Sequence, residues 1–155
     1  MRRRALLWAC LVMGWLAWPS EAEAAVRCQI QTVPVAFGTY NVFSNTVLTS
    51  VGNITVRCVG IGAGTTPITV FLNPGTSGSF QPRRMTRLGE TLSYNLFLDA
   101  NGTRIWGDGT SGTLIHSAVV SNNQLLNLPV FGRIPPGQDV GVGTYTDTIV
   151  ATVNF

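Results

Sequence analysis

The sequence TYTDTIVATVNF, residues 144–155, alternates polar and apolar side chains up to the last residue of the chain. This two-residue period is typical of a half-buried β-strand. The residues expected on its apolar face are Tyr145, Ile149, Ala151, Val153 and Phe155. A strand this apolar needs a neighbour along its edge. Because the sequence ends at Phe155, we expect that edge to be covered by another chain or left open.

Short alternating runs recur upstream, separated by clusters of Gly, Pro, Asn and Ser. No helical periodicity is visible after the first two dozen residues, so the pattern predicts an all-β sandwich or barrel. Strands are expected at about 27–35, around Ile54-Val56-Cys58, around Ile68-Val70-Leu72, along Leu92-Tyr94-Leu96-Leu98, near 114–120, near 125–131 and at the terminus. Turns are expected at residues 100–103, where Asn-Gly readily supplies positive φ, and at 135–137.

Residues 1–24 have the composition of a secretory signal peptide. Arg2, Arg3 and Arg4 precede an apolar run over residues 5–18, and Ala22-Glu23-Ala24 fits a cleavage site. The apolar run is shorter than the roughly 20 residues that a membrane-spanning helix needs. The sequence therefore predicts one exported domain over residues 25–155, in contact with a membrane only during export.

Charge and cysteine content narrow the classes of partner and compartment. The chain carries 10 Lys+Arg and 7 Asp+Glu, for a net charge of +3, and these charges are scattered. We therefore expect neither nucleic acid nor an anionic membrane as a partner. Export together with two cysteines after residue 24, Cys28 and Cys58, favours one disulfide formed in an oxidising compartment. Closing that loop contributes roughly 3 to 4 kcal/mol in the chain-entropy treatment.

Little in the sequence supports catalysis or metal binding. The single histidine, His116, lies beside Ser117 in an alternating strand, where neighbours point to opposite faces. One histidine and a disulfide-bonded cysteine pair leave no nitrogen and sulfur ligand set. Asp99, Asn101 and Asp108 lie in a Gly-rich stretch that lacks the acidic residue needed to close a calcium loop. We expect no enzymatic activity, no cofactor and no metal site.

Two further features have a functional and a structural interpretation. Arg83, Arg84 and Arg87 are the only local charge cluster after residue 24 and could contact an anion or a partner. We interpret them instead as part of a solvated loop whose arginines bond to nearby carbonyl groups. Trp106 could stack on a sugar, but as the only tryptophan after residue 24 it is better explained as a core anchor followed by a tight turn.

Several motifs, taken in order, carry a resemblance to a known family. They are Phe37-Gly38-Thr39-Tyr40, Arg84-Met85, Leu92-Ser93-Tyr94-Asn95-Leu96, Trp106-Gly107-Asp108-Gly109, Gly132-Arg133-Ile134-Pro135-Pro136-Gly137-Gln138 and Gly143-Thr144-Tyr145-Thr146-Asp147. Over nearly all of residues 28–155, the chain resembles the spore coat protein U domain, which subunits of archaic chaperone-usher pili share. The motif residues to which we assign a structural role are Trp106, Gly107, Asp108, Gly109, Gly132, Pro136 and Gly137.

The resemblance implies an immunoglobulin-like antiparallel β-sandwich that lacks its final strand. A periplasmic chaperone would first fill the groove beside residues 144–155, and an outer-membrane usher would then receive the subunit. The extension of a sister subunit would later replace the chaperone strand. If four or five apolar side chains are buried, the gross gain is on the order of 6 to 15 kcal/mol, comparable with the stability of a whole domain.

One departure from the family bears on the role of the chain. Shaft subunits that resemble it carry an alternating donor segment before the first cysteine, whereas only Ala25, Val26 and Arg27 would precede Cys28 here. We therefore expect an acceptor-only subunit at the tip of a fibre, serving surface attachment or biofilm formation. The alternative is a secreted spore-coat or matrix protein that is not assembled into a pilus. Neighbouring genes for a chaperone and an usher favour the pilus.

Overall fold

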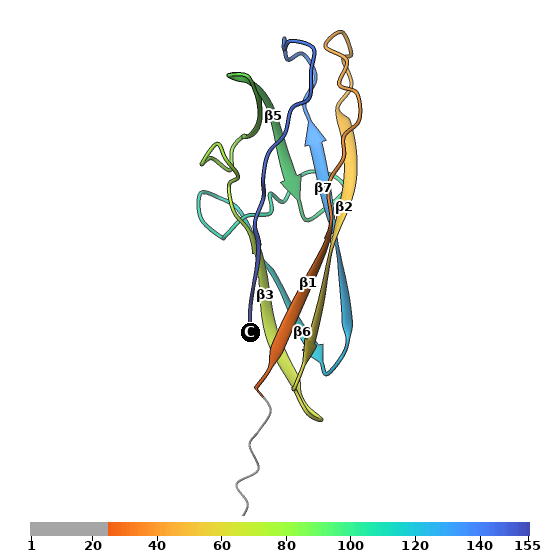
Figure 1. The fold of residues 1–155 in the computed structure, drawn as a ribbon, viewed down its shortest axis with the longest axis vertical. Helices are drawn as coiled ribbons and strands as arrows, with labels where there is room; N and C mark the ends of the chain where they lie inside the picture. Colours follow the sequence, from red (N-terminus) through yellow and green to blue (C-terminus); the bar gives the residue numbers. More distant parts are fainter. Residues whose placement is uncertain (1–24) are drawn as a thin grey trace, which may run out of the picture.

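Eight β-strands and no helix make up residues 25–155, the part of the chain that the computed structural model describes (Figure 1). The predicted signal peptide, residues 1–24, lies outside the described residues. None of the described residues belongs to a helix long and apolar enough to cross a membrane. The strands are β1 (Arg27–Val33), β2 (Leu48–Val59), β3 (Thr65–Leu72), β4 (Arg83–Arg87), β5 (Glu90–Phe97), β6 (His116–Ser121), β7 (Leu125–Ile134) and β8 (Ala151–Asn154).

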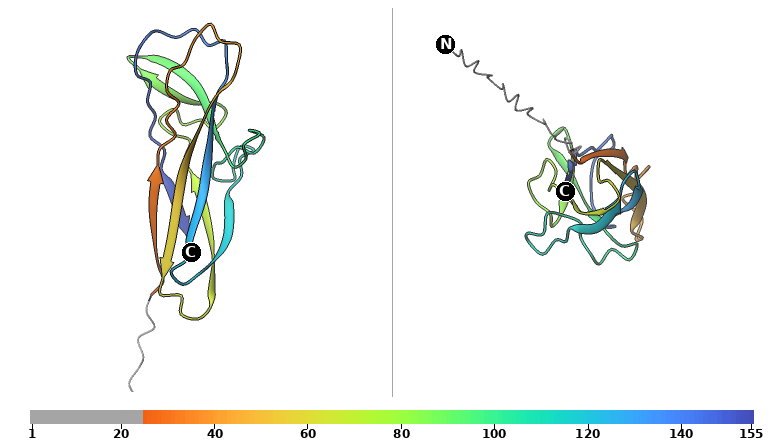
Figure 2. Two further views of the ribbon diagram at one scale, coloured as in Figure 1. Left: turned by 90° about the vertical axis from the view of Figure 1, so that its right-hand side faces the viewer. Right: turned by 90° about the horizontal axis from the view of Figure 1, so that it is seen from below.

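The strands form two antiparallel sheets, one with the order β1-β2-β7-β5-β4 and one with the order β6-β3-β8. Their inner faces pack together to form a sandwich that is elongated along the strands (Figures 1 and 2). Strand β1 is an edge of the larger sheet and β8 an edge of the smaller one. Both run along the same side of the molecule, and the sandwich is incomplete on that side. The predicted fold class, an immunoglobulin-like sandwich without its final strand, is confirmed.

Alternating apolar residues build the core from both sheets, as the sequence pattern predicted. Ile54, Val56 and Cys58 of β2 are buried, and so are Ile68, Val70 and Leu72 of β3 in the facing sheet. Successive strand residues point to opposite faces, so this period places one set inside and leaves the other in solvent. The longest ladder pairs β2 with β7, from Leu48 opposite Ile134 to Arg57 opposite Leu125.

Two predicted elements have different boundaries in the structure. Strand β1 ends at Val33 and not at Val35, because Pro34 has no N–H to donate to the ladder. Arg83–Arg87 is strand β4, paired with β5, and not the solvated loop that the charges indicated. The two-residue period of this strand was not visible in the sequence, because an arginine, Arg83, occupies a core-facing position beside Met85.

The predicted terminal strand, residues 144–155, forms a regular strand only at β8. There it pairs with β3, from Leu72 opposite Ala151 to Thr69 opposite Asn154. Before β8, the segment has one bridge to β4, in which Thr86 and Thr146 exchange backbone hydrogen bonds of 2.9 and 3.2 Å. The segment passes from the edge of the larger sheet to the edge of the smaller sheet. One neighbouring strand therefore cannot pair with the whole segment in a continuous ladder.

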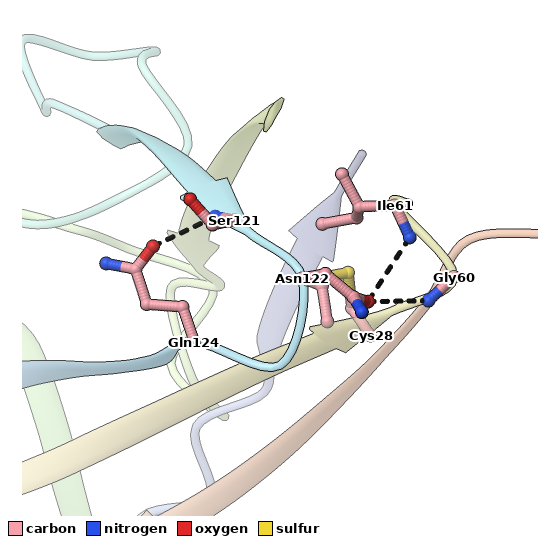
Figure 3. Close-up of a disulfide and its surroundings, with 7 residues drawn as sticks. Cys28, Gly60, Ile61, Ser121, Asn122 and Gln124 are labelled. Carbon is pink, nitrogen blue, oxygen red and sulfur yellow. Dashed lines mark hydrogen bonds between the residues drawn. A yellow bond between two sulfur atoms is a disulfide. The ribbon is translucent and has the colours of Figure 1, made fainter. Parts of the chain in front are cut away.

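The predicted disulfide between Cys28 and Cys58 is present and joins β1 to β2, with the two Cα atoms 4.0 Å apart. Figure 3 shows its surroundings at the end of the sandwich next to residue 27. Asn122 Oδ1 accepts hydrogen bonds from the backbone amides of Gly60 and Ile61, at 3.0 and 3.4 Å. The loops after β2 and β6 are thus tied together beside the disulfide.

Candidate functional site

A groove lies along the incomplete side of the sandwich. One wall is the end of β1 and the segment that follows it, residues 32–42, and the other wall is residues 140–151. The groove consists of two adjoining cavities of about 430 and 690 Å³. Both cavities are lined by Val35, Phe37, Met85 and Tyr145, so they form one continuous depression.

The floor of the groove is the hydrophobic core itself. Its side chains come from β2, β3, β5 and β7, and most of them are less than a tenth exposed. They include Ile54, Leu72, Leu92, Leu96, Val130 and Ile134. In a complete sandwich, a further strand would cover such a seam. The groove therefore presents apolar core surface to whatever enters it.

The predicted groove residues lie along one wall. Tyr145, Ile149 and Ala151 line the cavities, and Val153 packs against the core further along β8. Phe155 lies one residue beyond β8 and is 57% exposed. The structure thus brings four of the five to the core and leaves Phe155 at the end of the wall. Their role in holding another strand stays a prediction.

The opposite wall depends on a glycine. A Cβ atom on Gly132 of β7 would lie 2.4 Å from Val35 Cγ1 and 2.7 Å from Phe37 Cζ, so only glycine allows this close packing. Phe37 also meets the Tyr94 ring edge-on, with the ring centroids 6.0 Å apart. Phe37 was not among the predicted groove residues. The alternation of Val33, Val35 and Phe37 across Pro34 was the available signal.

Asp147 is the only charged residue among those that line the two cavities. Its Oδ2 accepts a 2.7 Å hydrogen bond from the Tyr94 hydroxyl, and its Oδ1 accepts bonds from the amide and hydroxyl of Thr76, both at 2.8 Å. Burial, and then the bond to Asp147, raise the pKa of Tyr94, so its hydroxyl stays protonated at neutral pH. Asp147 occupies a groove-facing position of the alternating pattern, between Tyr145 and Ile149. It was not predicted as a groove residue, because a charged side chain is not expected on an apolar face.

A second polar cluster closes one end of the groove. The Glu90 carboxylate accepts hydrogen bonds from the Tyr145 hydroxyl at 2.7 Å, from Arg87 at 3.0 Å and from the Gly141 amide at 3.2 Å. The bond from Tyr145 is the largest cause that lowers the pKa of Glu90. The hairpin of β4 and β5 is thereby clipped to the terminal segment.

Trp106 and Gly107 are buried, and the two residues after them, Asp108 and Gly109, form an exposed turn. Trp106 is fully buried, and its Nε1 donates to the Val70 carbonyl at 3.0 Å. Gly107 packs so closely on Thr113 that a Cβ atom would lie 2.4 Å from the threonine hydroxyl. Asp108 accepts bonds from the amide and hydroxyl of Thr110, and Gly109 has a φ of +88°. Pro136 is half-buried and Gly137 has a φ of +76°, both in the loop after β7.

The acidic residues considered for calcium serve turns within their own loops. Asp99 accepts bonds from the amides of Thr103 and Arg104. Over residues 25–155, no three His, Cys, Asp or Glu side chains come together as a metal site would require. His116 is half-buried next to the Trp106 ring, and burial lowers its pKa. None of these groups faces the groove.

Comparison with known proteins identifies the family. The profile of the Spore Coat Protein U domain matches residues 17–152. The chain belongs to the spore coat protein U domain family. This spore coat protein U domain is 34% identical over 128 residues to "Protein U" of Myxococcus xanthus, a match that covers 77% of this chain and 70% of the relative. The resemblance seen in the sequence motifs is confirmed.

Solved structures connect the same domain to a pilus. It is similar to a chain in the crystal structure of the CsuC-CsuE chaperone-tip adhesion subunit pre-assembly complex from archaic chaperone-usher Csu pili of Acinetobacter baumannii. The TM-score is 0.59 and the sequence identity 25%, over 84% of this chain and 40% of that chain. The spore coat protein U domain thus spans two-fifths of this neighbour. Its fold is that of chaperone-usher pilus subunits, which are structural proteins.

Proposed function

We propose that this chain is a non-enzymatic subunit of an archaic chaperone-usher pilus that takes a strand from another chain into the groove. The observation that carries the proposal is the open seam between β1 and residues 140–151, with core side chains as its floor. Strands β1 and β8 are both sheet edges, so an inserted strand can add backbone hydrogen bonds while its side chains cover the floor.

The proposed partners are a chaperone, an usher and a sister subunit. A periplasmic chaperone would fill the groove first, an outer-membrane usher would receive the subunit, and a sister subunit would supply the final strand. The similarity to a chain of a chaperone-subunit complex supports the chaperone. The Cys28–Cys58 disulfide supports passage through an oxidising compartment such as the periplasm, on the way to the cell surface.

Periplasmic expression tests this function. The full chain, with its own predicted signal peptide, is produced with and without a matched periplasmic chaperone. We expect soluble, protease-resistant protein only with the chaperone, recovered as a one-to-one complex. Equal yields of monomeric, protease-resistant protein in both cases would contradict the proposal.

Two neighbouring residues on opposite faces of one wall provide a matched control. Ile149 lines the groove, whereas Val150 is 53% exposed and points away from it. We expect Ile149→Glu to abolish recovery of the complex with the chaperone, because it places a charge inside the apolar groove. Val150→Glu should leave recovery unchanged. Equal effects of the two substitutions would show that the groove is not the binding surface.

We further propose that the subunit lies at the tip of the fibre, accepts a strand without donating one, and attaches to surfaces in biofilm formation. The similarity to a chain of a complex that contains a tip adhesion subunit supports the position. Three loops come together at one pole of the molecule (Figures 1 and 2). Attachment is supported by the large apolar side chains that these loops expose, one in each loop. These are Phe43, Leu88 and Val142, which are 89%, 91% and 95% exposed.

The acceptor-only role has its own test. A synthetic peptide that copies residues 25–40 is titrated into a sister subunit held in complex with the chaperone. We expect no displacement of the chaperone. Binding at micromolar strength would show that the chain also donates a strand.

The alternative function is a secreted coat or matrix protein outside a pilus. The 34% identity to "Protein U" of Myxococcus xanthus favours it. Immunogold electron microscopy of intact cells separates the two functions, because a pilus subunit labels fibres and a coat protein labels the cell or spore envelope.

A further inference from the structure

One wall of the groove is held in place mainly by side chains. Between Tyr145 and Val150, the terminal segment has only the bridge from Thr146 to Thr86 as a strand contact. A segment with so few ladder bonds, lying beside an open groove with an apolar floor, would be expected to fold inward and close the groove. The groove is nevertheless open in the structure.

Asp147 is the centre of the contacts that hold this wall. Its carboxylate accepts four hydrogen bonds, from the Tyr94 hydroxyl, the Thr76 amide and hydroxyl, and the Thr148 amide, all at 2.7 or 2.8 Å. Tyr94 belongs to β5 of the larger sheet, whereas Asp147 leads into β8 of the smaller sheet. The bond between them therefore ties this wall to the floor of the groove.

Asn73 holds the same segment at a second point. The Asn73 side-chain Oδ1 accepts a 2.9 Å hydrogen bond from the Val150 backbone amide. The Asn73 backbone amide donates a hydrogen bond to the Val150 carbonyl at 3.0 Å. The Asn73 carbonyl in turn accepts two bonds from the buried Arg83 guanidinium. A Cβ atom on Gly75 would lie 2.2 Å from Asp147 Oδ2, so the loop after β3 fits against the carboxylate only with glycine there.

We propose that Tyr94, Asp147, Thr76 and Asn73 form a polar bracket that keeps residues 145–150 in position as a groove wall while no strand occupies the groove. This inference rests on the proposed function of the groove as a strand acceptor. Apolar contacts are non-directional and would let the wall slide inward, whereas hydrogen bonds fix both distance and direction. Moving the wall inward would break bonds to a carboxylate, which are stronger than neutral ones.

Hydrogen exchange of the empty protein, exported as the full-length chain with its chaperone and then freed from the chaperone by mild denaturant, tests the bracket. Tyr94→Phe removes only the hydroxyl, and Asp147→Ala removes all four acceptor contacts. We expect the Thr76, Thr148 and Val150 amides to exchange at least tenfold faster in Asp147→Ala, and the Thr148 amide at least threefold faster in Tyr94→Phe. Amides of the β2–β7 ladder should stay within twofold. Acceleration that spreads equally over the β2–β7 ladder, or no acceleration, would overturn the proposal.

Two further variants serve as controls. Asp147→Asn keeps the Oδ1 acceptor, so it should restore the protection of the Thr76 and Thr148 amides. Thr55→Val removes a hydroxyl that donates to Asn127 on the outer face of the larger sheet, and it should leave the wall amides unchanged. Failure of Asp147→Asn to restore protection would overturn the assignment of Asp147 as an acceptor.

Spin labels measure the groove itself. Val33 and Val150 are exposed and lie on opposite walls, so nitroxide labels at these two positions report the distance between the walls. We expect one narrow distance distribution in the wild-type background and a broader or shorter one with Asp147→Ala. An unchanged distribution would overturn the proposal. Both readouts use the empty groove, so they separate failure of the bracket from failure of strand uptake.

Discussion

Arg83 is a charged side chain at the centre of the molecule, with none of its surface exposed. Its guanidinium donates to the Asn73 and Trp106 carbonyls and to Asn95 Oδ1, and it lies over the Phe80 ring. Burial lowers the pKa of Arg83 to about 10, so it remains protonated at neutral pH. This one residue connects the loop after β3, the segment around Trp106 and β5, all of which lie behind the groove.

We therefore expect Arg83→Met to lower the free energy of unfolding by about 2 to 4 kcal/mol, because it leaves several buried acceptors without a donor. Arg84, the next residue, is exposed on the outer face of β4, and Arg84→Met should change the free energy by less than about 0.5 kcal/mol. Urea denaturation of both variants measures the difference. Similar values for the two would contradict the role of Arg83 as a buried donor.

Leu88 combines two unfavourable features at the tip of the β4–β5 hairpin. Its side chain is 91% exposed. Its φ is +46° and that of Gly89 is +89°. A turn with two successive positive φ angles favours asparagine or glycine at the position that Leu88 occupies. We expect Leu88→Asn to stabilise the fold by up to about 1 kcal/mol and to weaken adsorption to an alkyl-coated surface. Thermal unfolding and a bead-binding assay measure the two effects. Unchanged adsorption would remove this pole from the proposed attachment surface.

Among the elements, β1 is an edge strand on which the shape of the groove depends. It pairs only with β2 and forms a wall of the groove, so its position determines the width of the acceptor site. The Cys28–Cys58 disulfide fixes its first residues to β2, whereas Pro34 ends its ladder at the other end. The element is thus secured covalently at its first residues, at the end opposite Pro34.

Replacing both cysteines by serine should lower the free energy of unfolding by about 2 to 4 kcal/mol. Cys58 is fully buried, so the serine hydroxyl adds to the cost. Hydrogen exchange should show faster opening of β1 than of the β2–β7 ladder. If β1 keeps its wild-type protection, the disulfide does not secure this edge.

The clip between the β4–β5 hairpin and the terminal segment depends on pH. Hydrogen bonds from Tyr145 and Arg87 lower the pKa of Glu90 below its ordinary value of 4.5. A carboxylate whose pKa is lowered by folding stabilises the folded state fully above the ordinary value. That contribution is lost as the pH falls below 4.5 and through the folded pKa. The clip is therefore intact at neutral pH.

An NMR titration of the Glu90 carboxyl carbon and the Gly141 amide should show both changing together below pH 4.5. In Tyr145→Phe, which lacks the largest cause of the shift, the midpoint should move up toward 4.5. A midpoint at or above 4.5 in the wild-type protein would contradict the clip.

At the scale of the whole molecule, the incomplete side makes the domain dependent on a partner. Its core is continuous with the groove floor, so apolar surface that a complete sandwich would bury stays accessible. If a partner strand contributes about 6 kcal/mol, the melting temperature of this domain should rise on the order of 20 °C. Differential scanning calorimetry of the chaperone complex and of protein freed from it by mild denaturant measures the change. A rise of only a few degrees would show that the groove contributes little to stability.

The sequence by itself determined the fold class, the inward-facing positions of β2, β3 and β5, the disulfide and the family. Each of these follows from local alternation, from cysteine content or from short motifs, which need no knowledge of what lies opposite. Tertiary structure alone decided that Arg83–Arg87 forms a strand, that Phe37 builds a groove wall over Gly132, and that Asp147 of the other wall bonds to Tyr94 on the groove floor. These features depend on contacts between residues far apart in the chain. A polar or charged side chain in a nonlocal network has no periodic pattern that identifies its partners.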